Sequence, residues 1–243
     1  MRMAVETWGL TKKFRSVVAV NNVYLRLPRG EIHILLGPRG AGKTTLLKLL
    51  LGFRKPTSGG GFCLGYDIVS ESISLRERMG YVSGNMALYG FMTVREIVSF
   101  TRNFFSYWDE QLVEHYLDFF TLPHRRPIRK LEHACRIQLA LILALAHRPG
   151  LLLLDEPTIH FSRSPEAEAF FEVLVSEQAQ KKMTVLLTTG SLDETRAAPG
   201  EISLIHRGRL LKNCMAREDL CLDELPADVE ELCLHYLSEE EKT

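Results

Sequence analysis

The stretch GPRGAGKTT, residues 37–45, constrains this chain more than any other part of its sequence. It matches the pattern G-x-x-x-x-G-K-[ST], in which a glycine-rich loop turns its backbone N–H groups toward phosphate. The apolar run at 32–36 is long enough for a buried strand, and the leucines of 46–51 are typical of a buried helix. The loop is therefore predicted between a strand and a helix, the setting in which this pattern binds phosphate.

Each kind of residue in this loop has a predicted part in binding a nucleotide. Its glycines permit a positive φ and a close approach to phosphate. The Lys43 ammonium is expected to reach the β- and γ-phosphates, and the Thr44 hydroxyl is expected to hold Mg²⁺. The predicted nucleotide-binding residues of the loop are Gly37, Pro38, Arg39, Gly40, Ala41, Gly42, Lys43, Thr44 and Thr45.

A second segment, LLLLDEPT at 151–158, supplies two carboxylates. Four leucines in a row predict a fully buried strand, and open α/β sheets bind their ligands at the carboxyl ends of such strands. Asp155 is expected to bind Mg²⁺ directly or through water. Glu156 is expected to act as general base on the attacking water, so Lys43 and Glu156 are the predicted catalytic residues.

Apolar periodicity predicts strands that alternate with helices along the rest of the chain. Strands are expected at 3–7, 17–27, 80–82, 184–189, 202–205 and 209–212. Helices are expected at 109–122, 132–147, 166–180, 191–196 and near 229–237, with another that begins at a capping box of Thr93 and Glu96. This alternation predicts an α/β fold with a mainly parallel sheet.

The composition narrows the class of protein and its expected location. The chain has 243 residues, of which 46% are hydrophobic and 25% charged, as is typical of a globular domain. Its 30 basic residues balance 30 acidic ones, so we expect no nucleic-acid partner. Five cysteines without C-x-x-C spacing indicate a reducing cytoplasm. The sequence shows no signal-peptide core and no apolar run of roughly 18 residues, so we expect any role at a membrane to depend on partners.

Taken together, the two phosphate-site segments resemble those of the ATP-binding subunits of ABC transporters, and the likeness covers most of the chain. Residues 37–45 resemble the family's Walker A segment, and residues 151–157 resemble Walker B. TVREIVSF at 93–100 resembles the start of the helical subdomain, and ISLIHRGRLL at 202–211 resembles the closing hairpin. The ending VEELCLHYL at 229–237 resembles that of subunits serving drug, antibiotic and polysaccharide exporters.

The resemblance implies a P-loop core with an antiparallel β subdomain and an inserted helical subdomain. We expect one domain, 1–243, made of a nucleotide-binding core with its β subdomain at 1–92 and 148–214, a helical subdomain at 93–147, and a C-terminal tail at 215–243. Phe14, which by itself favours a core position, falls where the family stacks an aromatic ring on adenine.

The resemblance also implies ligands, partners and a location. ATP with Mg²⁺ is the implied ligand. The implied partners are transmembrane permease subunits and a second ATP-binding subunit, in a homodimer or a heterodimer. The chain would then lie in the cytoplasm, peripheral on the inner face of the cell membrane.

The chain departs from the family pattern at four places. Gly84 stands where the family has a glutamine that senses Mg²⁺, and Gly190 stands where it has a histidine that contacts the γ-phosphate. The family signature LSGGQ is replaced by LEHAC at 131–135. In the loop after Walker B, Ser162 takes the place of an aspartate.

The intact Walker residues predict that binding of ATP and Mg²⁺ is kept, and the four departures predict that hydrolysis is slow. Glu132 would face a phosphate across a dimer, and like charges about 4 Å apart repel by about 1 kcal/mol even in water. The histidine missing at Gly190 belongs to a class of group that is typically worth about 10²–10⁴ in rate. Asn85, His133 and His160 are candidates to replace the missing groups.

Two functions of different classes follow. One is the ATP-binding subunit of an exporter, whose hydrolysis is slow or depends on a partner. The other is a nucleotide-binding clamp or regulatory module with little or no ATPase activity. A third possible function is that of an ABC protein in translation or DNA repair. The chain lacks the basic stripe, the tandem ATPase halves and the long coiled coil that would support it.

Overall fold

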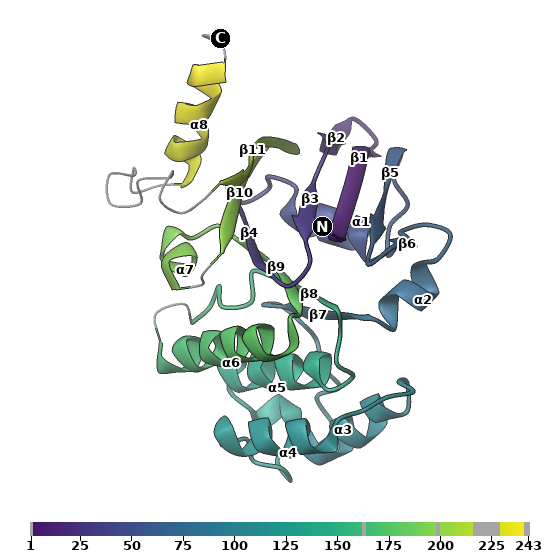
Figure 1. Ribbon diagram of the computed structural model, residues 1–243. Coiled ribbons are helices and arrows are strands. Elements are labelled where there is room, and N and C mark those ends of the chain that lie inside the picture. Colours follow the sequence, from purple (N-terminus) through teal and green to yellow (C-terminus); the bar gives the residue numbers. More distant parts are fainter. Residues whose placement is uncertain (1, 162–163, 198–199, 216–228, 241–243) are drawn as a thin grey trace.

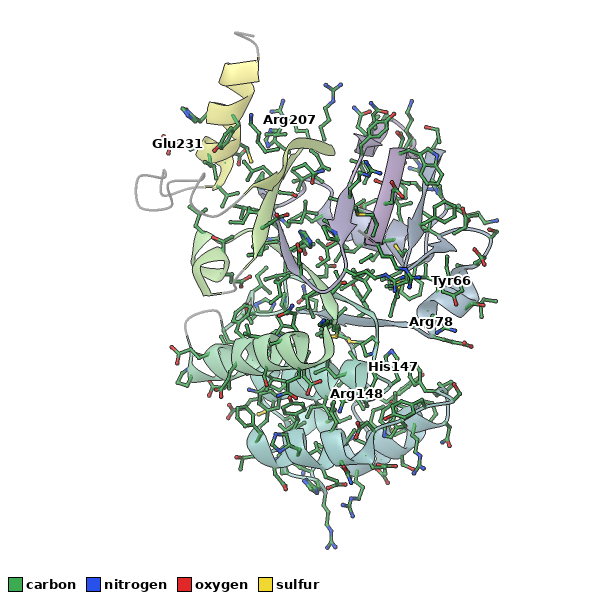
Figure 2. All side chains as sticks on the ribbon, in the orientation of Figure 1. Tyr66, Arg78, His147, Arg148, Arg207 and Glu231 are labelled. Atoms are coloured by element: carbon green, nitrogen blue, oxygen red, sulfur yellow. The ribbon has the colours of Figure 1, made fainter. Side chains whose placement is uncertain are left out.

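In the computed structural model, the chain folds into two β-sheets with helices packed around them (Figure 1), and Figure 2 shows the side chains in the same orientation. The structure describes residues 2–161, 164–197, 200–215 and 229–240. Within these residues one sheet has six strands in the order β11-β10-β4-β9-β8-β7. The other has five strands in the order β2-β1-β5-β6, with β3 paired to β1.

The larger sheet is parallel except at one edge. Its parallel strands are β4 (Ile32–Leu36), β7 (Met79–Ser83), β8 (Leu151–Asp155), β9 (Thr184–Thr189) and β10 (Glu201–His206). At the edge, β11 (Arg209–Met215) runs antiparallel to β10. Every residue of β4, β8 and β9 is buried, which explains why these strands are continuous apolar runs in the sequence.

The smaller sheet is antiparallel and lies over one face of helix α1 (Lys43–Leu50). Its strands are β1 (Met3–Phe14), β2 (Val17–Val23), β3 (Arg26–Pro28), β5 (Ser58–Cys63) and β6 (Tyr66–Asp67). The predicted strand 3–7 is too short, because β1 continues to Phe14 through Gly9, which has φ 56°. The predicted strand 17–27 divides in two, because β2 and β3 pair with different parts of β1.

Helices cover the opposite face of the parallel sheet. Helix α5 (His133–Leu145) contacts β7 and α6 (Pro165–Lys181), while α3 (Val94–Arg102) and α4 (Glu110–Phe119) pack against α5 farther from the sheet (Figure 1). The apolar faces of these helices share one core with β4, β8 and β9. The capping box at the start of α3 is confirmed, since the Thr93 side chain accepts from the Glu96 N–H and the Glu96 carboxylate accepts from the Thr93 N–H.

Three more helices lie at the margins of the fold. Helices α7 (Leu192–Ala197) and α8 (Val229–Glu240) lie close to their predicted positions, and α8 packs against β10 and β11 (Figure 1). Helix α2 (Ser72–Arg76) was not predicted, because so short a segment shows no clear helical period. The predicted α/β fold with a mainly parallel sheet, an antiparallel β part and helices inserted between strands is confirmed. The boundaries at residues 93, 148 and 215 stay a prediction.

Candidate nucleotide-binding site

The glycine-rich loop lies between β4 and α1, as predicted. Gly42 caps the N-terminus of α1 with φ 106°, and a Cβ there would lie 2.2 Å from the Ala19 carbonyl oxygen. Gly40 also has a positive φ, of 82°, but a Cβ there would meet nothing within 4 Å. The loop is thus closed on its inner side and open toward solvent, where the N–H groups of the helix N-terminus attract an anion.

Lys43 lies at the centre of the predicted site. Its Nζ donates to the carbonyl oxygens of Gly37 at 2.6 Å and Pro38 at 3.0 Å. The same nitrogen lies 2.9 Å from Glu156 Oε1, and the side chains of Lys43 and Glu156 are 4% and 26% exposed. The two predicted catalytic residues therefore contact each other directly, and a phosphate that reaches Lys43 must compete with Glu156.

Asp155 and Thr44, the predicted metal ligands, are hydrogen-bonded to each other. Thr44 Oγ1 donates to Asp155 Oδ1 at 2.9 Å. Asp155 lies at the carboxyl end of β8 and is 5% exposed. A hydroxyl oxygen beside a carboxylate is the kind of donor set that Mg²⁺ prefers, so these residues fit the predicted ion.

Two residues that were not predicted hold Asp155 in place. Thr188 Oγ1 donates to Asp155 Oδ1 at 3.1 Å, and the Tyr81 hydroxyl donates to Oδ2 at 3.3 Å. Burial, and then the charge of Asp155, raises the pKa of Tyr81 to about 12, so this hydroxyl keeps its proton. Both residues come from strands that flank β8, and the Thr-Thr ending of the predicted strand 184–189 was the available signal.

The backbone turns sharply after β8. Glu156 has φ 47°, which is uncommon for a residue other than glycine, and its N–H donates to the Thr188 carbonyl oxygen at 3.0 Å. The Gly84 N–H donates to the Asp155 carbonyl oxygen at 3.0 Å. These bonds fix the direction in which Glu156 leaves the strand toward Lys43.

Phe14 lies at the end of β1, on the surface and not in the core. Its ring is 40% exposed, with Lys12 Nζ 5.3 Å and Arg54 Cζ 6.0 Å from the ring centre. An exposed ring among cations suits a base that carries phosphates, and the adenine-stacking role stays a prediction.

Comparison with known proteins decides the family. A family model described as ABC transporter matches residues 20–159, which is more than half of the chain. The chain belongs to the ABC transporter family. The predicted resemblance to its ATP-binding subunits is thus confirmed. Members of this family bind and hydrolyse ATP, generally with Mg²⁺, and their ATP-binding subunits dimerise and work with transmembrane permease partners.

Curated relatives are ATP-binding proteins of several transporters, and one of them is named as an import protein. The probable multidrug ABC transporter ATP-binding protein YbhF of Escherichia coli is 32% identical over 85% of this chain, which spans 36% of the length of YbhF. The bacitracin transport ATP-binding protein BcrA of Bacillus licheniformis is 27% identical to this chain, over 87% of this chain and 70% of the length of BcrA. The osmoprotectant import ATP-binding protein OsmV of Salmonella typhimurium is 30% identical over 86% of this chain and 56% of its own.

Solved structures share the fold. A structure described as the ATP binding subunit of an ABC transporter has a TM-score of 0.80, with 21% identity, over 96% of this chain and 99% of that one. The ATP-binding cassette MJ0796 bound to ADP and Pi has a TM-score of 0.74, with 22% identity, over 85% of this chain and 96% of that one. Among the described residues no helix has the length and apolar character needed to cross a membrane.

Two of the positions at which this ABC chain departs from the expected pattern, Gly190 and Gly84, lie near Lys43 and Glu156. A Cβ at Gly190 would lie 3.5 Å from the Gly37 carbonyl oxygen and 3.8 Å from Lys43 Nζ. A Cβ at Gly84 would lie 2.2 Å from the Glu156 carbonyl oxygen. Ser162 lies outside the described residues.

The three candidate replacement residues contact one another. The imidazole Nε2 of His160 lies 3.1 Å from Asn85 Oδ1. The rings of His133 and His160 meet edge to face with centres 4.8 Å apart, and an Arg136 nitrogen lies 3.4 Å from His133 Nδ1. Three segments far apart in sequence therefore meet in one polar cluster, defined here as the Asn85–His133–His160 cluster.

Proposed function

We propose that this chain is the ATP-binding subunit of an ABC exporter, that it binds Mg-ATP, and that its hydrolysis of ATP is slow or depends on a partner. One observation carries the proposal. Two segments of the chain meet beyond the carboxyl ends of β4 and β8. Lys43 contacts Glu156 there, and Thr44 contacts Asp155. The loop 37–45 would hold the phosphates, with Phe14 against the adenine.

We give each of these residues a part in the hydrolysis of ATP to ADP and phosphate, and their contacts support it. Lys43 offsets the negative charge of the β- and γ-phosphates once it exchanges Glu156 for phosphate oxygens. Thr44 and Asp155 would hold Mg²⁺, which would supply further positive charge for the phosphates. Glu156, released from Lys43, takes a proton from the attacking water. Tyr81 keeps Asp155 in position throughout.

Slow hydrolysis follows from the groups that surround this centre. Gly190 leaves the space beside Lys43 without a side chain that positions the γ-phosphate. Glu132 precedes α5 and is exposed on the surface that, by family resemblance, faces the partner's nucleotide. In a heterodimer, a partner with an intact signature would complete this chain's Walker site. These features equally favour the second candidate, a clamp or regulatory module with little turnover.

Equilibrium binding of a fluorescent ATP analogue, with and without Mg²⁺, tests the proposed site. Lys43→Ala is expected to weaken binding strongly, and Asp155→Asn to remove most of the dependence on Mg²⁺. Lys48→Ala, in the last turn of the same helix, is the matched control and should bind as the wild type does. Equal binding by Lys43→Ala and Lys48→Ala would contradict the site.

An exposed aromatic surface supports a membrane partner. Tyr89, Phe91, Phe100 and Phe104 are 53%, 68%, 36% and 66% exposed, and their rings contact one another in a chain. Three of them line a groove of about 400 Å³ next to α3 and α5. Contiguous apolar surface of this kind marks an interaction site, and we assign it to the permease.

The remaining parts of the proposal concern assembly. The chain would form a homodimer or a heterodimer in the cytoplasm, peripheral on the inner face of the membrane. Export is favoured by the segment 229–237, which resembles the ending of exporter subunits, while the import protein OsmV shows that importers are also similar to this chain. We retain the division into a core at 1–92 and 148–214, a helical subdomain at 93–147 and a tail at 215–243.

A further inference from the structure

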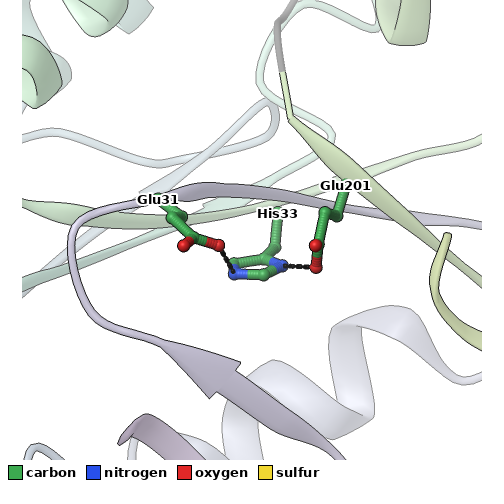
Figure 3. Close-up of side chains that lie close together, drawn as sticks. All are labelled: Glu31, His33 and Glu201. Atoms are coloured by element: carbon green, nitrogen blue, oxygen red, sulfur yellow. Dashed lines mark ion pairs between the residues drawn. The ribbon is translucent and has the colours of Figure 1, made fainter. Parts of the chain in front are cut away.

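A buried histidine between two glutamates lies at the end of the sheet opposite the nucleotide loop. His33, the second residue of β4, is 2% exposed, and neither of its ring nitrogens has a hydrogen-bond partner. Its Nε2 lies 3.6 Å from Glu31 Oε2, and its Nδ1 lies 3.7 Å from Glu201 Oε2 (Figure 3). The ring therefore lies between two carboxylates at ion-pair distance and is hydrogen-bonded to neither.

The parallel sheet brings these residues together. Glu201 begins β10 and is the register partner of His33, while Glu31 immediately precedes β4. The nucleotide loop begins at Gly37, beyond the carboxyl end of β4. Four residues of strand span roughly 13 Å, so the three side chains are separate from the Walker residues.

An imidazole in this setting is short of partners. Buried polar atoms are nearly always hydrogen-bonded, and an unsatisfied one costs about 1–3 kcal/mol. Burial lowers the pKa of His33, and the negative charge of Glu201 offsets this only in part. Both ring nitrogens are buried and unpartnered, and a nitrogen lone pair of imidazole is what histidine offers to a metal.

We propose that Glu31, His33 and Glu201 bind a divalent transition-metal ion, with Zn²⁺ as the first choice. One imidazole nitrogen and two carboxylates form a donor set that suits Zn²⁺, whereas Mg²⁺ prefers oxygen alone. One ligand atom from each residue lies within 4.8 Å of the other two.

The ion binds one ring nitrogen, so the glutamate that faces the other nitrogen must turn toward it. Zinc bonds of about 2.0–2.2 Å place tetrahedral ligand atoms about 3.4 Å apart. The glutamate side chains, 38% and 43% exposed, are free enough to close by the remaining ångström or so. The ion ties the amino ends of β4 and β10 together, and water completes its coordination.

Calorimetric titration of the chelator-treated full chain with Zn²⁺, without nucleotide, tests the site. We expect one ion per chain, and a loss of affinity of about tenfold or more in Glu31→Gln and in Glu201→Gln, which leave the buried ring in place. Glu168→Gln, at an exposed position of α6, is the matched control and should bind as the wild type does. Unchanged affinity in both glutamine variants would overturn the proposal.

Cobalt substitution separates this site from the five cysteines of the chain. Co²⁺ bound by nitrogen and oxygen gives visible bands without the strong near-ultraviolet band of a thiolate ligand. We expect the visible bands to vanish in Glu31→Gln and in Glu201→Gln. A thiolate band at one equivalent of Co²⁺ would place the ion at cysteine and contradict the proposal.

Discussion

At the scale of single residues, two glycines lie where related subunits are expected to carry longer side chains, and they differ in the room around them. A side chain at Gly190 would make only ordinary contacts, at 3.5 Å and 3.8 Å, with the Gly37 carbonyl oxygen and Lys43 Nζ. At Gly84 the Glu156 carbonyl oxygen would lie 2.2 Å from a Cβ. A group can therefore be restored at 190 without moving the backbone, but not at 84.

Gly190→His is expected to raise ATP turnover about tenfold or more. The new imidazole would lie beside Lys43, where a positioning group is typically worth about 10²–10⁴ in rate, although the altered signature limits the gain. Phosphate release at saturating Mg-ATP measures the effect. Gly190→Ala is the control. An equal gain in ATP turnover from alanine, or no gain from histidine, would contradict the prediction.

Gly84→Ala is expected to lower the free energy of unfolding by about 1–3 kcal/mol, because the backbone around Glu156 must shift to admit the methyl group. Urea denaturation of the apo chain measures this change. Gly190→Ala adds the same methyl group where there is space, and should change stability by about 0.5 kcal/mol or less. Equal midpoints for the two variants would show that the close contact at Gly84 is absent in solution.

At the scale of elements, the Asn85–His133–His160 cluster joins the loop after β7, the start of α5 and the loop after β8. Burial lowers the pKa of His133, with further contributions from the positive charges of His160 and Arg136. The backbone of Gly84 opposes this shift. The fold therefore favours the neutral ring and resists its protonation.

This shift gives the stability of the fold a dependence on pH. A histidine whose pKa is lower in the folded state does not change the free energy of unfolding at a pH above its unfolded pKa, about 6.5. As the pH falls below that value, the same histidine lowers the free energy of unfolding. His133→Asn is thus expected to lose less free energy of unfolding than the wild type between about pH 7 and 5. His115→Asn, at an exposed position of α4, should follow the wild type. If the free energy of unfolding fell equally with pH in the wild type and in His133→Asn, the prediction would be contradicted.

The elements also show where sequence patterns suffice. Continuous apolar runs identified β4, β8 and β9 because these strands are buried on both faces. The capping residues Thr93 and Glu96 located the start of α3. The length of β1 was underestimated because the strand passes through Gly9, at a positive φ, before it pairs with β2.

At the scale of the whole molecule, the parallel sheet carries a candidate binding site at each of its two ends. The meeting of Lys43 and Thr44 with Glu156 and Asp155 was predictable, because these residues lie at or just beyond the ends of buried strands within short motifs. Tyr81 and Thr188, and the grouping of Glu31, His33 and Glu201, were not, because they depend on which strands lie side by side. That order is set by long-range packing, and no local pattern in the sequence encodes it.

Steady-state ATP hydrolysis by the purified chain, compared with Glu156→Gln, tests the central claim most directly. Both proteins should bind Mg-ATP, since Glu156→Gln only removes the carboxylate that competes for Lys43. We predict that the wild type turns over no faster than Glu156→Gln until a partner subunit is added. Clear turnover by the wild type alone, lost in Glu156→Gln, would contradict the account and show that other residues have replaced the missing groups.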